Sequence, residues 1–515
     1  MKRALAAGLG LAVAMAGMLG PPSQAAAAVD ICRATNSDLD LNGDGYDDAV
    51  VGDPYATVNG RAEAGAVFVL YGDADRRIGQ GRRLLVTQAS FPGSNVEAGD
   101  HFGWSVAVAD ATGDGCADLL VGSPGEDLAG LADVGIAQLV SYAPDGRGGP
   151  GTPVASLYEQ AKLGETAEAG DQFGFAVAMG FGGDGVLAIG APGEDLGTAT
   201  DAGAVTNIYL EDDFIGEAGT TVQGRRVPGT PEAGDRFGAS VAVAPLWVTN
   251  GTDVGIEPVI LAGAPGDTVQ RGGVAVDGAG SVTAWDQVVG YEQLVTQESA
   301  GVPDGAESGD QFGFSLSFSE LNATQDDRSR LVAVGSPGED LGAQRDAGTV
   351  TLLADASGVG LQGGPLLSQD TAGYAGTPET GDRFGHAVAF RPDRGFNLRL
   401  AVAAPYEDLG SVLDAGLVQE VSVDTRELST LPTQVWTESS AGTPGTVAAR
   451  NRFGLSVTAL RGLAESVFAV SSPYQRSGSV FVAATDDTTR AWVPGAGGIP
   501  SSVGRFGWSV SGAAQ

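Results

Sequence analysis

The sequence predicts an all-β fold in which seven repeated units close into a ring. A Phe-Gly pair that opens an apolar run recurs seven times, at Phe102, Phe173, Phe237, Phe312, Phe384, Phe453 and Phe506. An ending of the Gly-Ala-Pro type also recurs seven times, at Pro54, Pro124, Pro192, Pro265, Pro337, Pro405 and Pro473. The two series are out of step, because the first ending lacks a preceding Phe-Gly and the last Phe-Gly lacks a following ending. A C-terminal strand that completes the N-terminal unit explains this offset.

Each unit is expected to consist of short β-strands. Apolar runs such as 66–70 and 106–108 are short and are bounded by Gly, Pro or Asp, which is typical of strands joined by turns. The repeat length of roughly 69 residues suits one small sheet per unit. The repeat therefore overrides the several domains that the length of 515 residues would suggest by itself.

This pattern resembles the FG-GAP repeat family, the propellers found at the head of integrin α subunits and in many secreted bacterial proteins. The resemblance covers nearly all of the chain after the first thirty residues. It implies a seven-bladed β-propeller at residues 29–515, with the C-terminal strand joining the N-terminal blade. Blade 1 is expected at about 38–90 plus 505–511, and blades 2 to 7 at about 96–165, 168–229, 232–300, 307–373, 379–442 and 450–498.

The N-terminus predicts a secreted protein, and the net charge limits its possible ligands. Residues 1–28 have a charged start at Lys2-Arg3, an apolar middle and a small-residue cleavage site at Ala25–Ala27, which together indicate a signal peptide. A membrane anchor is the alternative, but the apolar run is short and interrupted by Gly. The formal charge of −36 disfavours nucleic acid and anionic lipid, and it suits a cation or a basic ligand. We expect a released monomer without stable membrane insertion.

Two cysteines remain in the predicted mature chain, Cys32 and Cys116. A single disulfide is the economical interpretation in an exported protein. Cys32 precedes the acidic loop of blade 1 and Cys116 lies within that of blade 2, and these loops should be neighbours in a ring. The bridge would tie the N-terminus to the next blade. Two separate thiols are the alternative.

Two acidic loops carry the clearest chemistry. The first contains Asp40, Asn42, Asp44, Tyr46 and Asp48 at positions 1, 3, 5, 7 and 9. The second contains, at the same positions, Asp110, Thr112, Asp114, Cys116 and Asp118. Oxygen side chains at alternate positions, with a backbone carbonyl at position 7, suit Ca²⁺, which takes six to eight oxygen ligands.

These loops are not EF-hands, because Val51 and Val121 occupy position 12, where that motif has Glu. By resemblance they are the calcium loops of FG-GAP blades, which makes Ca²⁺ the expected cofactor. Ordinary Asp/Gly turns without a metal are the alternative. The other five blades lack the full spacing, and we assign no metal to them.

A second acidic pattern flanks the recurring motifs: Glu-x-Gly-Asp precedes Phe-Gly, and Glu-Asp follows the Pro. The candidates for a ligand-binding face are Glu97, Asp100, Glu126, Asp127, Glu168, Asp171, Glu194, Asp195, Glu339, Asp340, Glu407 and Asp408. Antiparallel pairing of the first two strands should bring both patterns to one end of each blade, opposite the calcium loops. In integrins, by resemblance, ligand binds on the face away from these loops. Two interpretations stay open: carboxylates that stabilise turns, and a face that binds cations or a basic ligand.

No catalytic set is readable in the sequence. His101 occupies a slot that varies between repeats, whereas His386 occupies a slot of packing residues. The tryptophans outside the Phe-Gly motif are expected in core or edge packing rather than on a ligand surface; they are Trp247, Trp285, Trp436 and Trp492. We therefore expect a non-enzymatic adhesion-type module that binds an extracellular protein or carbohydrate. The alternatives are an extracellular hydrolase or lyase with its site in the channel, and a structural matrix or surface protein.

Overall fold

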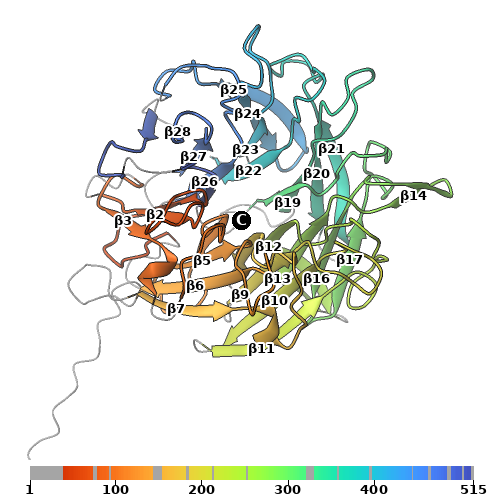
Figure 1. Ribbon diagram of the computed structural model, residues 1–515. Helices are drawn as coiled ribbons and strands as arrows, with labels where there is room; N and C mark the ends of the chain where they lie inside the picture. The colour runs from red at the N-terminus through yellow and green to blue at the C-terminus, as the bar shows by residue number, and fades with distance from the viewer. Residues whose placement is uncertain are drawn as a thin grey trace, which may run out of the picture.

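The computed structural model shows blades arranged around a central axis (Figure 1). The residues that it describes are 39–73, 78–91, 94–142, 153–180, 185–211, 214–250, 253–319, 330–356, 359–393, 397–443, 445–461, 466–483, 489–500 and 504–511. The predicted signal peptide and Cys32 lie outside these residues, so secretion and the Cys32–Cys116 disulfide stay predictions.

Seven four-stranded antiparallel sheets form the seven blades within the described part of the chain, which confirms the predicted fold class. Blade 1 contains β1 (Ala49–Asp53), β2 (Ala66–Leu70), β3 (Arg83–Val86) and β30 (Ser509–Ser511). Blade 2 contains β4 (Ser105–Ala109), β5 (Asp118–Ser123), β6 (Ile136–Tyr142) and β7 (Pro153–Tyr158). Blade 3 contains β8 (Ala176–Gly180), β9 (Val186–Ala191), β10 (Ala204–Glu211) and β11 (Phe214–Thr221). Blade 4 contains β12 (Ser240–Asn250), β13 (Asp253–Ala264), β16 (Ser281–Asp286) and β17 (Tyr291–Val295).

The remaining three blades have the same strand order. Blade 5 contains β18 (Ser315–Phe318), β19 (Arg330–Ser336), β20 (Thr349–Ala356) and β21 (Gly360–Leu367). Blade 6 contains β22 (Ala387–Pro392), β23 (Asn397–Ala404), β24 (Leu417–Asp424) and β25 (Ser429–Trp436). Blade 7 contains β26 (Val457–Arg461), β27 (Ser466–Ser471), β28 (Val480–Ala483) and β29 (Thr489–Trp492).

A few elements lie outside the blades. A hairpin of β14 (Val269–Arg271) and β15 (Val274–Val276) projects from blade 4 (Figure 1). The helices in the described residues are two 3₁₀ turns, η2 (Gln88–Ser90) and η3 (Gln160–Leu163). None of the described helices is long and apolar enough to cross a membrane.

The ring closes as the offset of the repeats predicts. β30 pairs antiparallel with β1, with Val510 opposite Val51, while β1 pairs with β2 on its other side. The C-terminal strand therefore supplies the fourth strand of the N-terminal blade. This pairing covers an inner edge of β1 that would otherwise be open.

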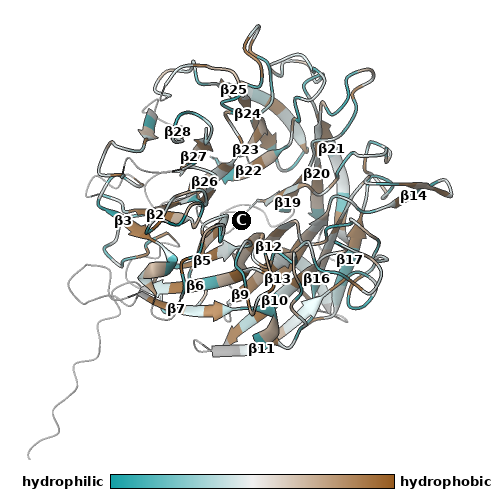
Figure 2. Ribbon diagram, in the orientation of Figure 1, coloured by the Kyte–Doolittle hydropathy of each residue, from teal (hydrophilic) through white to brown (hydrophobic). Residues whose placement is uncertain are grey.

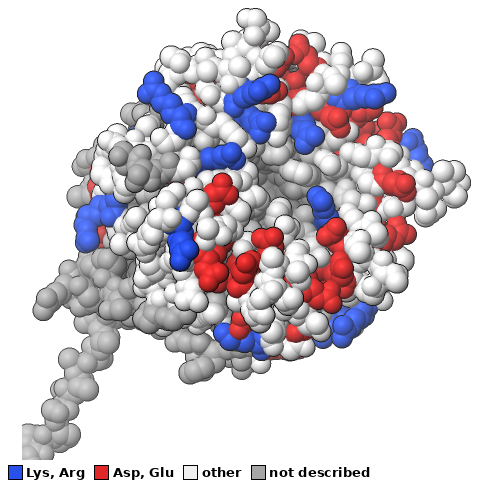
Figure 3. All heavy atoms as spheres, in the orientation of Figure 1, with Lys and Arg blue, Asp and Glu red and all other residues white. Residues whose placement is uncertain are grey.

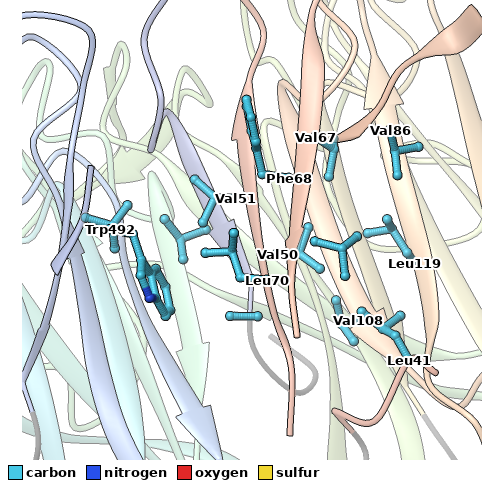
Figure 4. Packing of buried hydrophobic residues seen from close by; sticks show 14 of the residues in the cluster. Leu41, Val50, Val51, Val67, Phe68, Leu70, Val86, Val108, Leu119 and Trp492 are labelled. Atoms are coloured by element: carbon cyan, nitrogen blue, oxygen red, sulfur yellow. The ribbon is translucent and has the colours of Figure 1, made fainter. Parts of the chain in front are cut away.

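Burial follows the position of a strand within its blade. All six residues of β5 are buried, because neighbouring blades cover both faces of an inner strand. The outermost strand β25 has both exposed and buried positions, because its outer surface meets solvent. Figure 2 shows apolar residues along the strands and polar residues in the connections. Figure 4 shows the packing in and around blade 1, where Val50, Val51 and Trp492 belong to one buried cluster.

The recurring motifs hold adjacent blades together. Every Phe of a Phe-Gly pair is at most 1% exposed. The Gly of the Gly-Ala-Pro motif is required by close approach, because a Cβ at Gly122 would lie 1.9 Å from the Gly174 carbonyl oxygen of the next blade. The Ser that follows two residues after Phe-Gly adds a hydrogen bond in several blades; Ser240 Oγ, for example, donates to the Gly313 carbonyl of blade 5 at 2.6 Å.

We expect Ser240→Ala to lower the free energy of unfolding by about 1 kcal/mol, because the link between blades 4 and 5 loses its donor. Ser411→Ala is the matched control, since Ser411 is exposed in the connection between β23 and β24. Urea unfolding of the two variants beside the wild type measures the difference. Equal losses in both variants would contradict a role for this bond between blades.

Candidate functional site

The first acidic loop is wound around its own carboxylates. Asp40 accepts hydrogen bonds from the N–H groups of Gly43, at 2.8 Å, and Gly45, at 2.8 Å. Asp48 accepts from the Leu41 N–H at 2.9 Å and from the Gly72 N–H, just after β2, at 2.9 Å. Burial raises the pKa of Asp48 well above its usual range, and Asp40 nearby adds to this shift. Two carboxyl groups buried together favour protonation or a bound cation.

The second loop repeats the pattern of the first. Gly115 N–H donates to Asp110 at 3.0 Å, and Ala111 N–H donates to Asp118 at 3.0 Å. Burial raises the pKa of Asp118 to about 7. The two loops are neighbours, as predicted, because Ala117 N–H donates to the Asp40 carbonyl at 3.1 Å.

The donor chemistry of both loops fits Ca²⁺, because each offers carboxylate oxygens that are buried and costly to leave charged. In the described residues, however, no three His, Cys, Asp or Glu side chains are grouped as a metal site. The loop carboxylates are instead turned toward backbone N–H groups. Calcium binding at these residues stays a prediction.

The acidic residues on the opposite side fall into three sets with different contacts. The Asp before Phe-Gly accepts from the N–H three residues earlier at 2.5–2.6 Å in five blades, as Asp100, Asp171, Asp235, Asp310 and Asp382 do. The second residue of each Glu-Asp pair accepts from a later Asp N–H at 2.8–3.0 Å, as Asp127, Asp195, Asp340 and Asp408 do. The carboxylates of these two sets therefore form hydrogen bonds within their own turns.

The third set is bonded to a glutamine. Glu126, Glu194, Glu339 and Glu407 accept from the Nε2 groups of Gln88, Gln160, Gln297 and Gln369, respectively, at 2.5–2.7 Å. Glu97 and Glu168 differ from all of these, because their side chains are exposed. The two acidic patterns do meet at one end of each blade, as the topology predicts: the charge of Asp100, for example, acts on Glu126.

Burial of these pairs changes their protonation. It raises the pKa of Glu339 to about 9 and that of Glu407 to about 8, and the adjacent Asp310 and Asp382 add to the respective shifts. Burial also raises the pKa values of Asp310 and Asp382 themselves to about 7. One carboxyl of such a pair therefore retains a proton near neutral pH.

Blades 7 and 1 depart from this pattern. In blade 7, Glu438 stands at the position of the glutamine, and Asn451 stands at that of the Asp before Phe-Gly. Glu438 accepts hydrogen bonds from Asn451 Nδ2 and Ser472 Oγ, each at 2.6 Å. In blade 1 the carboxylate moves to Asp53, which accepts from the N–H groups of Gly504 and Arg505, each at 2.7 Å. Each of these blades keeps one hydrogen-bonded carboxylate with different partners, while the number of acidic residues falls.

A cavity of about 440 Å³ lies on the axis of the ring. A ring of aliphatic side chains lines it, one from the inner strand of each blade: Val106, Val177, Val241, Leu316, Val388, Val457 and Val510. Aromatic rings also line it, including the half-buried Trp104 and Trp508, whose ring centroids are 4.9 Å apart. No Asp or Glu occurs among the described residues that line this cavity. A mostly apolar, concave site with a few polar groups is typical of a ligand pocket.

An alternating row of arginines and tyrosines runs along blades 6, 7 and 1 beside this cavity. We call it the Arg–Tyr row; in order around the ring it comprises Arg383, Tyr406, Arg452, Tyr474, Arg505 and Tyr55. Each guanidinium carbon lies 4.2–5.3 Å from the centroid of the adjacent tyrosine ring. Arg505 also donates to the Tyr474 hydroxyl at 3.3 Å. His101 extends the row, with its ring centroid 5.3 Å from that of Tyr55.

The comparisons with known proteins agree with the repeated motifs. The family model described as "FG-GAP repeat" matches residues 37–70 and 102–140. These two stretches are FG-GAP repeats. A relative, Integrin alpha pat-2 of Caenorhabditis elegans, is 41% identical over 87 residues, which cover 16% of this chain and 6% of that protein.

Solved structures resemble the chain more distantly. A functionally unknown protein from Desulfotomaculum acetoxidans has 10% identity and a TM-score of 0.45, covering 90% of this chain and 99% of its own. The periplasmic gluconolactonase PpgL of Pseudomonas aeruginosa has 12% identity and a TM-score of 0.45, covering 90% and 98%. Similarity at this level carries no functional information.

The Arg–Tyr row was not among the site residues predicted from the sequence. The residue after the recurring Pro could have indicated the row, because it is Tyr in blades 1, 6 and 7 and Gly in blades 2 to 5. His386 packs against the rings of Phe314 and Tyr406, as the sequence predicted, but it also lines the cavity. Trp285, Trp436 and Trp492 are buried, as expected, and Trp247 is half-buried.

Proposed function

We propose that this chain is a secreted, calcium-stabilised binding module that takes an extracellular ligand at the mouth of its axial cavity. The observation that carries the proposal is the Arg–Tyr row. Most features of the ring repeat from blade to blade and serve the scaffold, whereas this row occupies three adjacent blades. A specific site needs different side chains that converge from different blades, and only asymmetry of this kind provides them.

Backbone conformation supports the proposal. The residue before Phe-Gly has a positive φ in six blades, for example 56° at Arg383 and 54° at Arg452. Glycine would adopt this conformation without strain, but the six residues are Arg, Gln or His. Within the Arg–Tyr row, Arg383 and Arg452 therefore keep a long polar side chain at an energetic cost, which is typical of functional positions.

The calcium loops have a separate role in this proposal. Bound Ca²⁺ would neutralise the buried carboxylates of blades 1 and 2, with Asp40, Asn42, Asp44 and Asp48 as ligands in the first loop and Asp110, Thr112, Asp114 and Asp118 in the second. The Tyr46 and Cys116 carbonyls would complete the sets. Stabilisation of the N-terminal blades, rather than direct contact with the ligand, is what their position at the opposite face supports.

Screening tests the proposal. Purified protein is applied to an array of extracellular glycans and to a panel of extracellular matrix proteins, and each hit is checked for turnover. We expect at least one hit without turnover that Trp508→Ala and Tyr474→Ala weaken about tenfold or more. Leu431→Ala is the control, because Leu431 is exposed on the outermost strand of blade 6. Hits that both mouth variants bind normally would contradict the location, and turnover would favour the hydrolase or lyase alternative.

A further inference from the structure

Resting on the proposed function, we infer that the ligand is an acidic glycan, whose carboxylate binds Arg452 and Arg505 and whose sugar ring packs on Trp104 and Trp508. This inference differs from the basic ligand that the net charge of the chain suggests. The residues at the mouth of the cavity, rather than the net charge of the whole chain, indicate the charge of the ligand.

The arginines of the row have no carboxylate partner in the described structure, although Arg505 gives one N–H to the Tyr474 hydroxyl. Among the described residues, none of the three guanidinium groups has a carboxylate within ion-pair distance. Tyrosine stacking uses the face of a guanidinium, so the N–H groups on its edge stay available to a planar anion. Arg452 lines the cavity, and its Nε is buried without a hydrogen-bond partner in the described structure. A carboxylate is the natural partner for such a group, since it can accept two parallel N–H bonds.

Blades 7 and 1 carry fewer of the acids that ring the other blades, although Glu438 and Asp53 remain there. Where blade 6 has Glu379, Gly381 and Asp382, blade 7 has Ala448, Arg450 and Asn451. After the Pro, Glu-Asp is replaced by Gln475-Arg476 in blade 7 and by Ala56-Thr57 in blade 1. Figure 3 agrees with this trend on the face in view: most red side chains lie over the lower and right-hand parts, with blue ones among them, whereas the upper left shows mainly blue ones. An anion approaching blades 7 and 1 therefore meets less repulsion than elsewhere on this face.

The pKa of His386 also indicates a positive electrostatic potential at the cavity wall. Burial, together with the charges of Arg383 and Arg452, lowers its pKa to about 4, so the ring is neutral at physiological pH. Its Nδ1 has no hydrogen-bond partner in the described structure. A neutral imidazole at the cavity wall can exchange a hydrogen bond with a sugar hydroxyl without competing for the carboxylate.

The two tryptophans favour a glycan over an acidic peptide. Trp104 and Trp508 lie side by side at the cavity, and both keep part of their rings exposed. Flat apolar surfaces with a polar edge suit the C–H face of a pyranose ring. A cavity of about 440 Å³ has room for one or two sugar residues.

The test uses trigalacturonate, its fully methylated ester, a neutral trisaccharide and triglutamate, each titrated calorimetrically at constant Ca²⁺. The ester keeps the sugar but loses the charge, so it isolates the carboxylate. We expect trigalacturonate to bind, and the ester and the neutral sugar to bind at least tenfold more weakly. Arg452→Gln and Arg505→Gln should each weaken trigalacturonate at least tenfold, whereas Arg450→Gln, two residues away and exposed, should leave its affinity unchanged.

The outcomes separate this inference from the proposed function. Equal binding of acid and ester, lost in Trp508→Ala but not in Arg452→Gln, would overturn the anionic ligand and leave the mouth as the site. Binding of triglutamate alone, with the same dependence on the arginines, would overturn the glycan in favour of an acidic peptide. No binding of any of the four probes would overturn the inference, while hits on the wider array would still support the proposed function.

Discussion

Lowering the pH from about 8.5 to about 5.5 is expected to raise the melting temperature of this protein by about 5 °C or more. The cause is the set of buried carboxyl groups near the Phe-Gly turns. Folding raises the pKa of Glu339 from 4.5 to about 9 and that of Glu407 from 4.5 to about 8. A carboxyl group whose pKa is higher in the folded state stabilises the fold while it holds its proton, and this contribution is lost as the pH rises through the folded pKa.

The size of the effect follows from the number of pairs. One pKa unit corresponds to about 1.4 kcal/mol, and after discounting for coupling within a pair we expect about 2 kcal/mol from each of blades 2, 3, 5 and 6. The lowered pKa of His386 acts in the opposite direction, but it is a single group. Calorimetric melting curves at fixed ionic strength and fixed calcium measure the shift.

Glu339→Gln and Glu407→Gln separate this effect from the general loss of negative charge at low pH. Each amide keeps an oxygen that can accept the bond from Gln297 or Gln369, and blade 7 already has Gln475 at the position of these glutamates. The double variant should show a clearly flatter dependence on pH and should be the more stable protein at high pH. A melting temperature that stays constant, or falls, between high and low pH would contradict the account of these pairs.

Addition of Ca²⁺ to chelator-treated protein is expected to stabilise the fold by about 2.7 kcal/mol for each site at one hundred times Kd. Two equivalents should bind, because two loops carry the complete set of oxygen donors. Asp44→Ala and Asp114→Ala should each remove one equivalent. Isothermal titration and melting curves recorded together check both numbers.

Asp370→Ala is the control for charge removal, since Asp370 is an exposed residue outside both loops. It should bind two equivalents, as we expect of the wild type. More than two equivalents would show that carboxylates near the Phe-Gly turns also bind cations. The absence of heat and of stabilisation would mean that both loops are ordinary turns held by the N–H contacts of Asp40 and Asp48.

The architecture was predictable because its signal is repeated seven times. The offset between Phe-Gly and the Pro endings predicted that β30 would pair with β1, and the structure confirms it. The physical reason for the motifs is visible only in three dimensions: Gly122 is needed because the next blade approaches within the space of a Cβ. The alternation of strands and turns, by contrast, can be predicted from short stretches of sequence.

The partners of the acidic residues could not be predicted from their own neighbourhood. Gln88 lies 38 residues before Glu126, and their side chains come together only because blades 1 and 2 are neighbours in the ring. The Arg–Tyr row was missed for a related reason. Its members come from different repeats, and each looks like a minor variation when one repeat is considered alone. Comparison of the slot after Pro across all seven repeats would have separated Tyr55, Tyr406 and Tyr474 from the four glycines.

Hydroxyl-radical footprinting tests most directly the central claim that ligand binds at the mouth of the axial cavity. The protein is labelled with and without trigalacturonate, or with the tightest binder of the array. The account predicts protection of Trp104, Trp508 and Tyr474, with no change at Tyr46 in the first acidic loop. Protection at Tyr46 without protection at the two tryptophans would place the ligand on the opposite face and contradict the claim.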